Sequence, residues 1–244
     1  MKTGIITGTG KGIGLSALKL LLKNKYKIIS ITKTKNNAIE TLLKKKNFIK
    51  NIYHSLGEDL LSDKKLINEI CKKHNIDFIV CNAGVRHRDS LHKMNLEKRN
   101  YTLNVNYHSN VVLIEELLKY FNKKKSPLSV VCISSIVGNF GFKDLSSYAS
   151  SKTALEGFLK SIAVEYAKRN VRINLIAPGF IKSSYYNNFI KNQKDINKWI
   201  LERTPMGRWG KPEEVSNVIE FLISEKSSYI TGSTIYVDGG WNIS

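Results

Sequence analysis

The chain has 244 residues, of which 42% are hydrophobic and 24% charged, as is ordinary for one globular domain that needs no disulfide or metal. No apolar run is long enough to span a bilayer, the start is too soon glycine-rich for a signal peptide, and Cys71, Cys81 and Cys132 fit no metal-ligand spacing. The formal net charge of +19 comes from lysines scattered along the chain, beside no zinc-finger, helix-turn-helix or RNA-binding pattern. We therefore expect a cytoplasmic protein without metal, with membranes excluded and nucleic acid disfavoured as partners.

Short apolar runs alternate with longer amphipathic ones from one end of the chain almost to the other. The short runs predict seven strands at 4–7, 27–31, 48–53, 77–81, 129–134, 171–177 and 233–237. The amphipathic stretches predict helices at 13–22, 38–45, 63–73, 103–121 and 148–168, and a last one that begins at Pro212. Such alternation predicts one α/β domain over residues 1–244, doubly wound around a mostly seven-stranded parallel sheet with helices on both faces. The irregular, aromatic stretch 180–210 is either a lid over a site or a surface connection.

A glycine-rich loop joins the first predicted strand to the first helix, with the sequence Thr7-Gly8-Thr9-Gly10-Lys11-Gly12-Ile13-Gly14. Glycines at this place allow a tight turn and a close approach of the backbone to a pyrophosphate. The helix N-terminus that follows offers unpaired N–H groups and the positive end of its dipole. A glycine run alone is weak evidence, but its place between a strand and a helix predicts a Rossmann-type dinucleotide site.

The second strand indicates which dinucleotide is bound. An acidic residue about 20 residues beyond the loop would bind the ribose 2′-hydroxyl of NAD. Here the strand is followed by Thr32-Lys33-Thr34-Lys35, which contains no carboxylate. Because a lysine attracts a 2′-phosphate, and Lys11 adds a second cation, we expect NADP(H) in preference to NAD(H).

Three polar residues form a candidate catalytic group. Tyr148 and Lys152 are four residues apart at the head of a predicted helix, so both project from one face. Ser135 lies thirteen residues before Tyr148, at the carboxyl end of a predicted strand, and this is the edge of an open α/β sheet that binds ligands. A Tyr-x-x-x-Lys pair alone is usually a surface pair, but with Ser135 and the glycine loop it predicts one active site.

These motifs together resemble the classical short-chain dehydrogenase/reductase family over essentially the whole chain, and within it members similar to 3-oxoacyl-(acyl-carrier-protein) reductases. Residues 7–14 match the Thr-Gly-x-x-x-Gly-x-Gly loop of the family, and Asp59, followed by Leu60, matches its acidic residue after the third strand. Residues 81–84 match its Asn-Asn-Ala-Gly motif with Cys in the first position, and Asn106 matches its active-site asparagine. The segment that grips the nicotinamide carboxamide is matched by Pro178, Gly179, Ile181 and Ser183, with serine where threonine is usual.

The resemblance implies that hydride passes from a nicotinamide to a carbonyl carbon while Tyr148 protonates the oxygen. Ser135 would polarise the carbonyl, Lys152 would stabilise the phenolate and hold the nicotinamide ribose, and Asn106 with a water would connect the site to solvent. The expected catalytic residues are therefore Asn106, Ser135, Tyr148 and Lys152. The expected cofactor-binding residues are Gly8, Gly10, Lys11, Gly12, Ile13, Gly14, Lys33, Asp59, Leu60, Asn82, Ala83, Gly84, Tyr148, Lys152, Pro178, Gly179, Ile181 and Ser183.

The substrate stays open at this point, with a 3-oxoacyl thioester or a sugar-like ketone as candidates. The run Arg86-His87-Arg88 suits an anionic or carrier-bound substrate, but a solvated loop explains it equally well, and the basic runs 123–125 and Arg169 discriminate poorly. Aromatic residues expected to line the pocket or the core are Phe140, Phe142, Phe180, Tyr185 and Tyr186.

Two other function classes remain open. One is a nucleotide-sugar epimerase or dehydratase, although such enzymes usually carry a longer C-terminal domain. The other is a non-catalytic polyanion-binding protein, which only the net charge of +19 supports. The family resemblance further implies a homotetramer, or a homodimer, in which the helices 103–121 and 148–168 pair across a two-fold axis.

Overall fold

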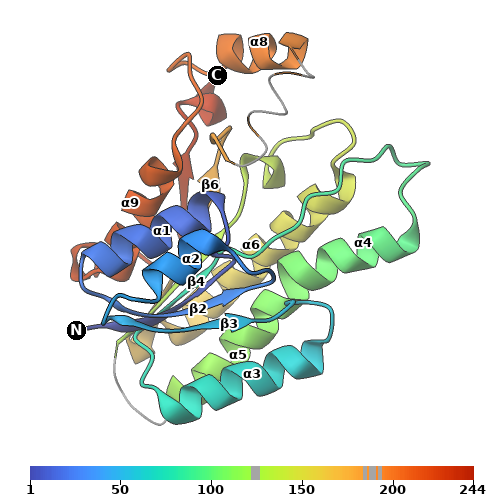
Figure 1. Ribbon diagram of the computed structural model, residues 1–244. Helices are drawn as coiled ribbons and strands as arrows, with labels where there is room; N and C mark the ends of the chain where they lie inside the picture. Colours follow the sequence, from blue (N-terminus) through green and yellow to red (C-terminus); the bar gives the residue numbers. More distant parts are fainter. Residues whose placement is uncertain (122–126, 184–185, 187–190, 192–193) are drawn as a thin grey trace.

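One parallel sheet of seven strands runs through the molecule in the order β3-β2-β1-β4-β5-β6-β7 (Figure 1). The computed structural model describes residues 1–121, 127–183, 186, 191 and 194–244. The strands are β1 (Thr3–Thr7), β2 (Lys27–Thr32), β3 (Phe48–Tyr53), β4 (Phe78–Cys81), β5 (Leu128–Ile133), β6 (Val171–Pro178) and β7 (Thr234–Val237). All seven strands that the sequence predicts are present within a residue or two, and the predicted fold class is confirmed.

The central strands are buried on both faces, as parallel strands between two helix layers must be. Every residue of β4 and β5 is buried, and both strands consist largely of apolar residues. The chain reverses its direction of travel across the sheet at β1, which pairs with β2 on one side and β4 on the other. This switch point opens a crevice at the carboxyl ends of the strands, where doubly wound sheets bind their ligands.

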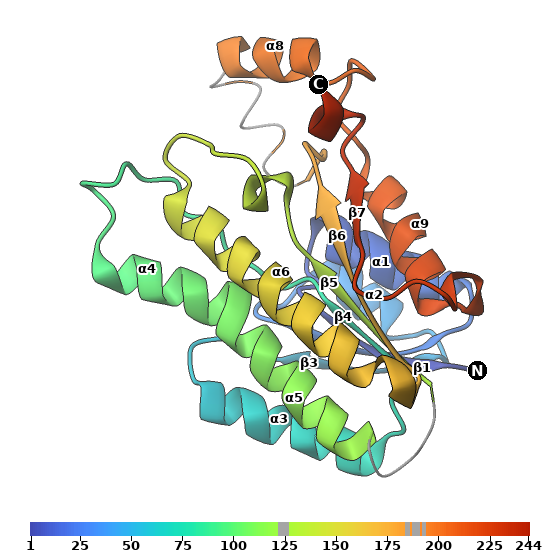
Figure 2. The same ribbon diagram turned by 180° about the vertical axis from the view of Figure 1, so that it is seen from behind.

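Helices cover both faces of the sheet. The helices are α1 (Gly12–Lys23), α2 (Asn37–Leu42), α3 (Leu60–Lys73), α4 (Leu96–Leu103), α5 (Ser109–Phe121), α6 (Ser146–Tyr166), α8 (Lys194–Arg203) and α9 (Pro212–Ile223). Buried side chains of α1, α2 and α9 pack on one face of the sheet, and those of α3, α5 and α6 on the other. Figure 2 shows the second group in front of the sheet, with α8 beyond the carboxyl ends of β6 and β7.

Two helical features differ from the sequence prediction. The helix predicted at 103–121 begins earlier, as α4, and is interrupted by a π-helical segment at Asn104–His108 before α5. Such insertions concentrate at functional sites, and this one contains the buried Asn106. The stretch 180–210, predicted to be irregular, contains the helix α8. Within the described residues, no helix is both long and apolar enough to cross a membrane.

Candidate active site

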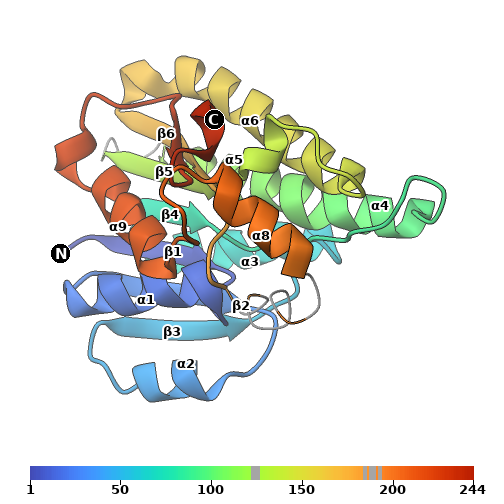
Figure 3. The ribbon, with the colours of Figure 1, turned by 90° about the horizontal axis from the view of Figure 1, so that it is seen from above.

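Two adjoining cavities lie at the carboxyl ends of the strands. Figure 3 shows the ribbon from above, the side on which α8 lies in Figure 1. The smaller, which we call the inner cavity, has a volume of about 270 Å³ and is lined from β5, β6 and α6. The larger, which we call the outer cavity, has a volume of about 730 Å³ and is lined by the glycine loop and the ends of β2 and β3. Both are lined by Ile13, Asn82, Gly84, Val85, Arg86 and Ser183. The shared wall makes the two cavities one continuous cleft.

The glycine loop forms the floor of the outer cavity and is held from below. Gly8 has a φ of +70°, and a Cβ there would lie 2.8 Å from the backbone of Ala83, so no other residue fits. The side-chain amide of Asn82 donates hydrogen bonds to the carbonyl oxygens of Thr7 (3.2 Å) and Gly8 (3.0 Å). The predicted Asn82-Ala83-Gly84 segment therefore supports the loop from the end of β4. The Cys in place of the family's first Asn is Cys81, which is buried inside that strand.

The outer end of the cleft is cationic. Lys11, Lys33 and Arg86 all line it. The ammonium of Lys33 lies 2.6 Å from Oε1 of Glu58 and 3.4 Å from the hydroxyl of Tyr101. The hydrogen bond to Glu58 raises the pKa of Lys33 and lowers that of Glu58. A phosphate entering here would compete with Glu58 for Lys33.

Asp59 and Leu60, predicted to bind the cofactor, are not among the residues that line the two cavities. The carboxylate of Asp59 instead caps the N-terminus of α3, where it accepts a hydrogen bond from the N–H of Leu61 (3.0 Å). His54 and Leu56 line the outer cavity in their place. Because β3 ends at Tyr53, the residues directly after it are the ones that meet the other strand ends. The predicted strand 48–53 ends at the same residue as β3, so the sequence already indicated that the residues directly after position 53 would meet the cleft.

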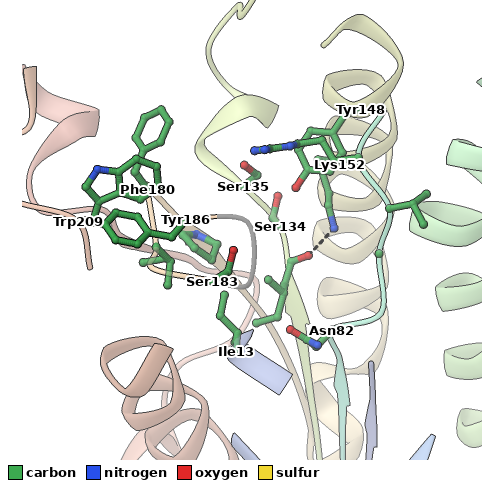
Figure 4. A pocket seen from close by; sticks show the side chains of 17 residues that line it. Ile13, Asn82, Ser134, Ser135, Tyr148, Lys152, Phe180, Ser183, Tyr186 and Trp209 are labelled. Atoms are coloured by element: carbon green, nitrogen blue, oxygen red, sulfur yellow. Dashed lines mark hydrogen bonds between the residues drawn. The ribbon is translucent and has the colours of Figure 1, made fainter. Parts of the chain in front are cut away.

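Ser135, Tyr148 and Lys152 lie together in the inner cavity, as the sequence predicts (Figure 4). Lys152 is 4% exposed, and its ammonium donates a hydrogen bond to the carbonyl of Ile133 (2.7 Å) and lies 5.8 Å from the centre of the Tyr148 ring. Ser135 begins a short 3₁₀ turn at Ile136–Gly138, and its Oγ accepts a hydrogen bond from the N–H of Val137 (3.2 Å). That contact leaves the serine proton to be donated towards the cavity.

Asn106 lies behind the cavity wall, not in it. Its Oδ1 accepts from the N–H of Val85 (2.8 Å), and its Nδ2 donates to the carbonyl of Val85 and to Oγ of Ser151, each at 2.9 Å. A Cβ on Gly84 would lie 3.2 Å from Oδ1 of Asn106 and 3.8 Å from Nζ of Lys152. Asn106 therefore fixes the segment of Gly84 and Val85, which lines both cavities, and lies on the same side of Gly84 as the ammonium of Lys152.

An aromatic wall faces the polar residues across the inner cavity (Figure 4). It consists of Phe180, Tyr186 and Trp209, with ring centres 5.4 Å apart for Phe180 and Trp209 and 5.0 Å apart for Tyr186 and Trp209. The indole N–H of Trp209 donates to Asn197 on α8 (2.9 Å). The sequence suggested Phe180 and Tyr186 for this role but missed Trp209, which joins them only through the fold.

Of the other predicted residues, some line the inner cavity and others pack in the apolar core beside it. Pro178, Gly179, Ile181 and Ser183 all line the inner cavity. Phe140 and Phe142 pack in an apolar cluster with Trp241 and do not line it. Of the basic run, Arg86 lines both cavities and His87 the outer one, while Arg88 lines neither. Tyr185 and the basic run 123–125 lie outside the described residues. Among the residues described, no group of three or more His, Cys, Asp or Glu could hold a metal ion.

Known proteins resemble this chain over nearly its whole length. A family model described as enoyl-(acyl carrier protein) reductase matches residues 8–242. The 3-oxoacyl-[acyl-carrier-protein] reductase of Rickettsia prowazekii (strain Madrid E) is 34% identical over 239 residues, which covers 98% of this chain and 96% of that protein. The corresponding enzyme of Thermotoga maritima is 33% identical over 245 residues, covering 98% and 97%.

Solved structures also resemble this chain over nearly its whole length. The structure of 4-hydroxyisoleucine dehydrogenase complexed with NADH matches with a TM-score of 0.93 at 26% identity, covering 100% of both chains. The structure of ElxO with NADP bound matches with a TM-score of 0.87 at 30% identity, covering 98% of both chains. The chain accordingly belongs to the short-chain dehydrogenase/reductase family, whose members are oxidoreductases that use a nicotinamide cofactor.

Proposed function

We propose that the chain is an NADP(H)-dependent reductase that converts a carbonyl into a secondary alcohol, with Tyr148 as proton donor. The observation that carries this proposal is the meeting of Ser135, Tyr148 and Lys152 in one cavity that adjoins a cation-lined one. The cleft also fits a dinucleotide, because Gly8, Gly10 and Gly12 of the glycine loop line the outer cavity, where a pyrophosphate can approach their backbone.

The polar residues divide the chemistry among them. A bound nicotinamide supplies the hydride to the carbonyl carbon. Ser135 donates a hydrogen bond to the carbonyl oxygen and stabilises the charge that develops there. Tyr148 transfers its proton to that oxygen, and the new O–H bond replaces the phenolic one. The ammonium of Lys152 lies 5.8 Å from the ring centre. A unit charge about 5 Å from the phenolate oxygen stabilises it by about 3 kcal/mol at an effective dielectric of 20.

After each turnover Tyr148 must regain a proton, and we propose that Asn106 and Lys152 provide the route for it. We assign to Asn106 the task of holding the π-helical segment and a water that leads to solvent. Its side chain is fully buried and bonded to both backbone groups of Val85, so its orientation is fixed. Lys152 shares the task because it lies on the same side of Gly84.

The preference for NADP(H) rests on charge. Lys11 and Lys33 line the outer cavity, and the chain after β2 carries no carboxylate that would repel a 2′-phosphate. We propose that NADPH binds at least about tenfold more tightly than NADH, a difference of about 1.4 kcal/mol. Glu58 limits this preference, since its hydrogen bond to Lys33 must be exchanged for one to the phosphate.

The aromatic wall favours an apolar substrate. A sugar-like ketone needs hydrogen-bond partners along its length, whereas Phe180 and Trp209 offer ring surface and the indole N–H is already donated to Asn197. We therefore propose a 3-oxoacyl thioester or a similar apolar carbonyl compound, with Arg86 at the shared wall facing an anionic group. All three aromatic residues come from the 180–210 stretch, which supports its role as a substrate loop.

The deciding experiment is NADPH oxidation by the purified protein with acyl thioesters, ketoses, keto acids and quinones as separate substrate classes. We expect turnover with apolar thioesters and little with ketoses. Turnover of ketoses alone would refute the substrate proposal and leave the reaction class intact. Failure to bind NADPH, together with tight and salt-dependent binding of DNA, would support the polyanion-binding alternative instead.

We also propose that the chain forms a homotetramer, or at least a homodimer, through α5 and α6. Val164 on α6 is 82% exposed and Phe158 is half-buried, so this helix keeps an apolar surface. Leu113, Leu117 and Leu155 are fully buried in the core of the single chain and do not contribute. A sedimentation mass equal to one 27.7 kDa chain at micromolar concentration would refute the proposal.

A further inference from the structure

Glu156 is a buried carboxylate beside the active site that the proposed chemistry does not use. It lies one turn after Lys152 on α6 and is 4% exposed. Its Oε1 accepts a hydrogen bond of 2.6 Å from the hydroxyl of Ser134, and its Oε2 lies 3.7 Å from the ammonium of Lys160. Ser134 itself lines the inner cavity and precedes Ser135 in the chain.

The contact joins two separate parts of the site. Ser134 follows the end of β5, whereas Glu156 belongs to the helix that carries Tyr148 and Lys152. Ser134 and Lys152 lie close to each other on the same side of the inner cavity in Figure 4. The hydrogen bond therefore ties the strand end that presents Ser135 to the helix that presents the proton donor.

The short turn after Ser135 is fastened to the same helix. A Cβ on Gly138 would lie 3.3 Å from Oε1 of Glu156 and 3.6 Å from Cβ of Lys152, so the turn packs directly on this part of α6. Thr153 donates a further hydrogen bond to the carbonyl of Gly138 (2.7 Å). The turn that begins at Ser135 is thus held at both of its ends.

Stability alone does not account for a carboxylate in this place. Burying a charge costs free energy that its partners only partly return, and an apolar side chain of similar size often serves a core at least as well. What a carboxylate adds is direction, because it holds the Ser134 hydroxyl at one distance and angle. Direction matters most where two reacting groups must meet at one oxygen atom.

We propose that Glu156 is a positioning residue, which acts through Ser134 to hold Ser135 at a fixed distance from Tyr148. The inference rests on the proposed function, in which Ser135 and Tyr148 bind the same carbonyl oxygen. A displacement of about 1 Å in such a pair can lower a rate by up to about 100-fold. Removal of the carboxylate therefore reduces turnover and leaves cofactor binding unchanged, because Glu156 lines neither cavity and Lys152 is anchored separately to the carbonyl of Ile133.

The test compares Glu156→Ala, Glu156→Gln and Ser134→Ala in steady-state ketone reduction, with NADPH titration and thermal unfolding for each variant. We expect Glu156→Ala and Ser134→Ala each to lower kcat about tenfold, with the dissociation constant of NADPH within about twofold of wild type. Glu156→Gln, whose amide oxygen still accepts from Ser134, should recover most of the rate. Glu116→Ala is the matched control, since Glu116 is equally buried (4% exposed) but lies on α5 and should lose stability without losing kcat.

A double variant separates positioning from general damage. If Glu156 acts through Ser134, the variant with both residues changed to Ala loses no more rate than either single variant. Additive losses, a full kcat in Glu156→Ala, or an equal loss in Glu116→Ala would each overturn the proposal. A wild-type protein that reduces no ketone would overturn the proposed function as well. An active wild type with an unaffected Glu156→Ala would overturn the positioning role alone.

Discussion

The two walls of the inner cavity are built on different physical principles. On one side, Lys152 and Ser134, with Asn106 behind them, are each fixed by buried hydrogen bonds of 2.6 to 2.9 Å to atoms of other elements. On the other side, Phe180 and Trp209 meet through ring surfaces with centres 5.4 Å apart, and the indole N–H of Trp209 is bonded to Asn197.

The difference indicates which wall determines the reaction and which the substrate. Buried hydrogen bonds allow one arrangement of donor and acceptor, as proton transfer to a single oxygen requires. Apolar ring surfaces accept several shapes at a similar free energy, as the selection of an apolar chain requires. Changes to the polar wall should therefore alter the rate for every substrate, and changes to the aromatic wall should alter the ranking of substrates.

The largest effect is expected from Tyr148→Phe. The ring still packs as before, and only the proton and its hydrogen bonds are lost, so fold and NADPH binding should persist. General acid catalysis is typically worth about 10²–10⁴-fold, and no other residue of the polar wall is assigned to protonate the alkoxide, so kcat should fall by at least about 100-fold. Steady-state reduction of any accepted ketone measures the loss, and NADPH fluorescence titration checks the cofactor site. A variant that retains more than about a tenth of the rate would show that the proton donor is misassigned.

A smaller effect, on the preference for NADPH over NADH, is expected from Lys33→Asp. Lys33 lines the outer cavity and belongs to neither wall of the inner one. The substitution places a carboxylate after β2, where it repels a 2′-phosphate and accepts from a 2′-hydroxyl. The wild-type preference for NADPH, expected to be at least about tenfold, should narrow or invert. Glu58→Gln is the complementary variant, since it releases Lys33 and should tighten NADPH without affecting NADH. Fluorescence titration with both cofactors gives the ratio, and equal dissociation constants in the wild type would refute the charge argument.

The sequence predicted what depends on residues close together in the chain. Tyr148 and Lys152 share a helix face, and the glycine loop lies between its own strand and helix, so spacing alone placed them. The seven strands and their parallel, doubly wound arrangement follow from the alternating pattern and the family resemblance. These strands lie where they were expected.

The sequence did not predict contacts between distant segments. Nothing near Trp209 in the chain indicates that its ring meets Phe180, or that Glu156 accepts from Ser134. Asp59 was assigned to the cofactor site by its match to the family's acidic residue after the third strand, whereas in the structure it caps α3. The predicted strand 48–53 ends where β3 ends, so the difference lies in which residue after the strand meets the cleft, and that residue is His54.

The aromatic wall itself is tested by Trp209→Ala. Loss of one aromatic contact is worth about 1 kcal/mol, so kcat/KM for an apolar ketone should fall about fivefold, while that for a small hydroxylated ketone should stay near the wild-type value. Trp209→Phe keeps a ring but not the bond to Asn197, and should preserve the ranking if the ring surface is what matters. Trp199→Ala serves as control, because this exposed tryptophan lies on α8 and does not line the cavity. An equal loss with both ketones would refute the division between the walls.

The smallest effect is expected from Glu214→Gln, which removes the ion pair between Arg208, next to Trp209 of the aromatic wall, and Glu214 on α9. Arg208 binds both carboxylate oxygens of Glu214, at 2.9 and 2.6 Å, and the N–H of Lys211 donates to the same carboxylate. The hydrogen bond from Arg208, followed by that from the Lys211 backbone, lowers the pKa of Glu214 to about 2. Because the folded pKa lies below the ordinary value of 4.5, the stability from this pair is complete above pH 4.5 and is lost as the pH falls towards about 2.

Both partners are more than a third exposed, so solvent screens the pair and its contribution stays below about 1 kcal/mol. Glu214→Gln should therefore lower the free energy of unfolding only slightly at pH 7. The difference from wild type should shrink as the pH falls below 4.5 and as salt is added. Urea unfolding of both proteins at several pH values measures it, with Glu165→Gln on the exposed side of α6 as control. A difference that stays constant down to pH 3, or that exceeds about 2 kcal/mol, would mean that Glu214 holds the Trp209 segment by more than a surface ion pair.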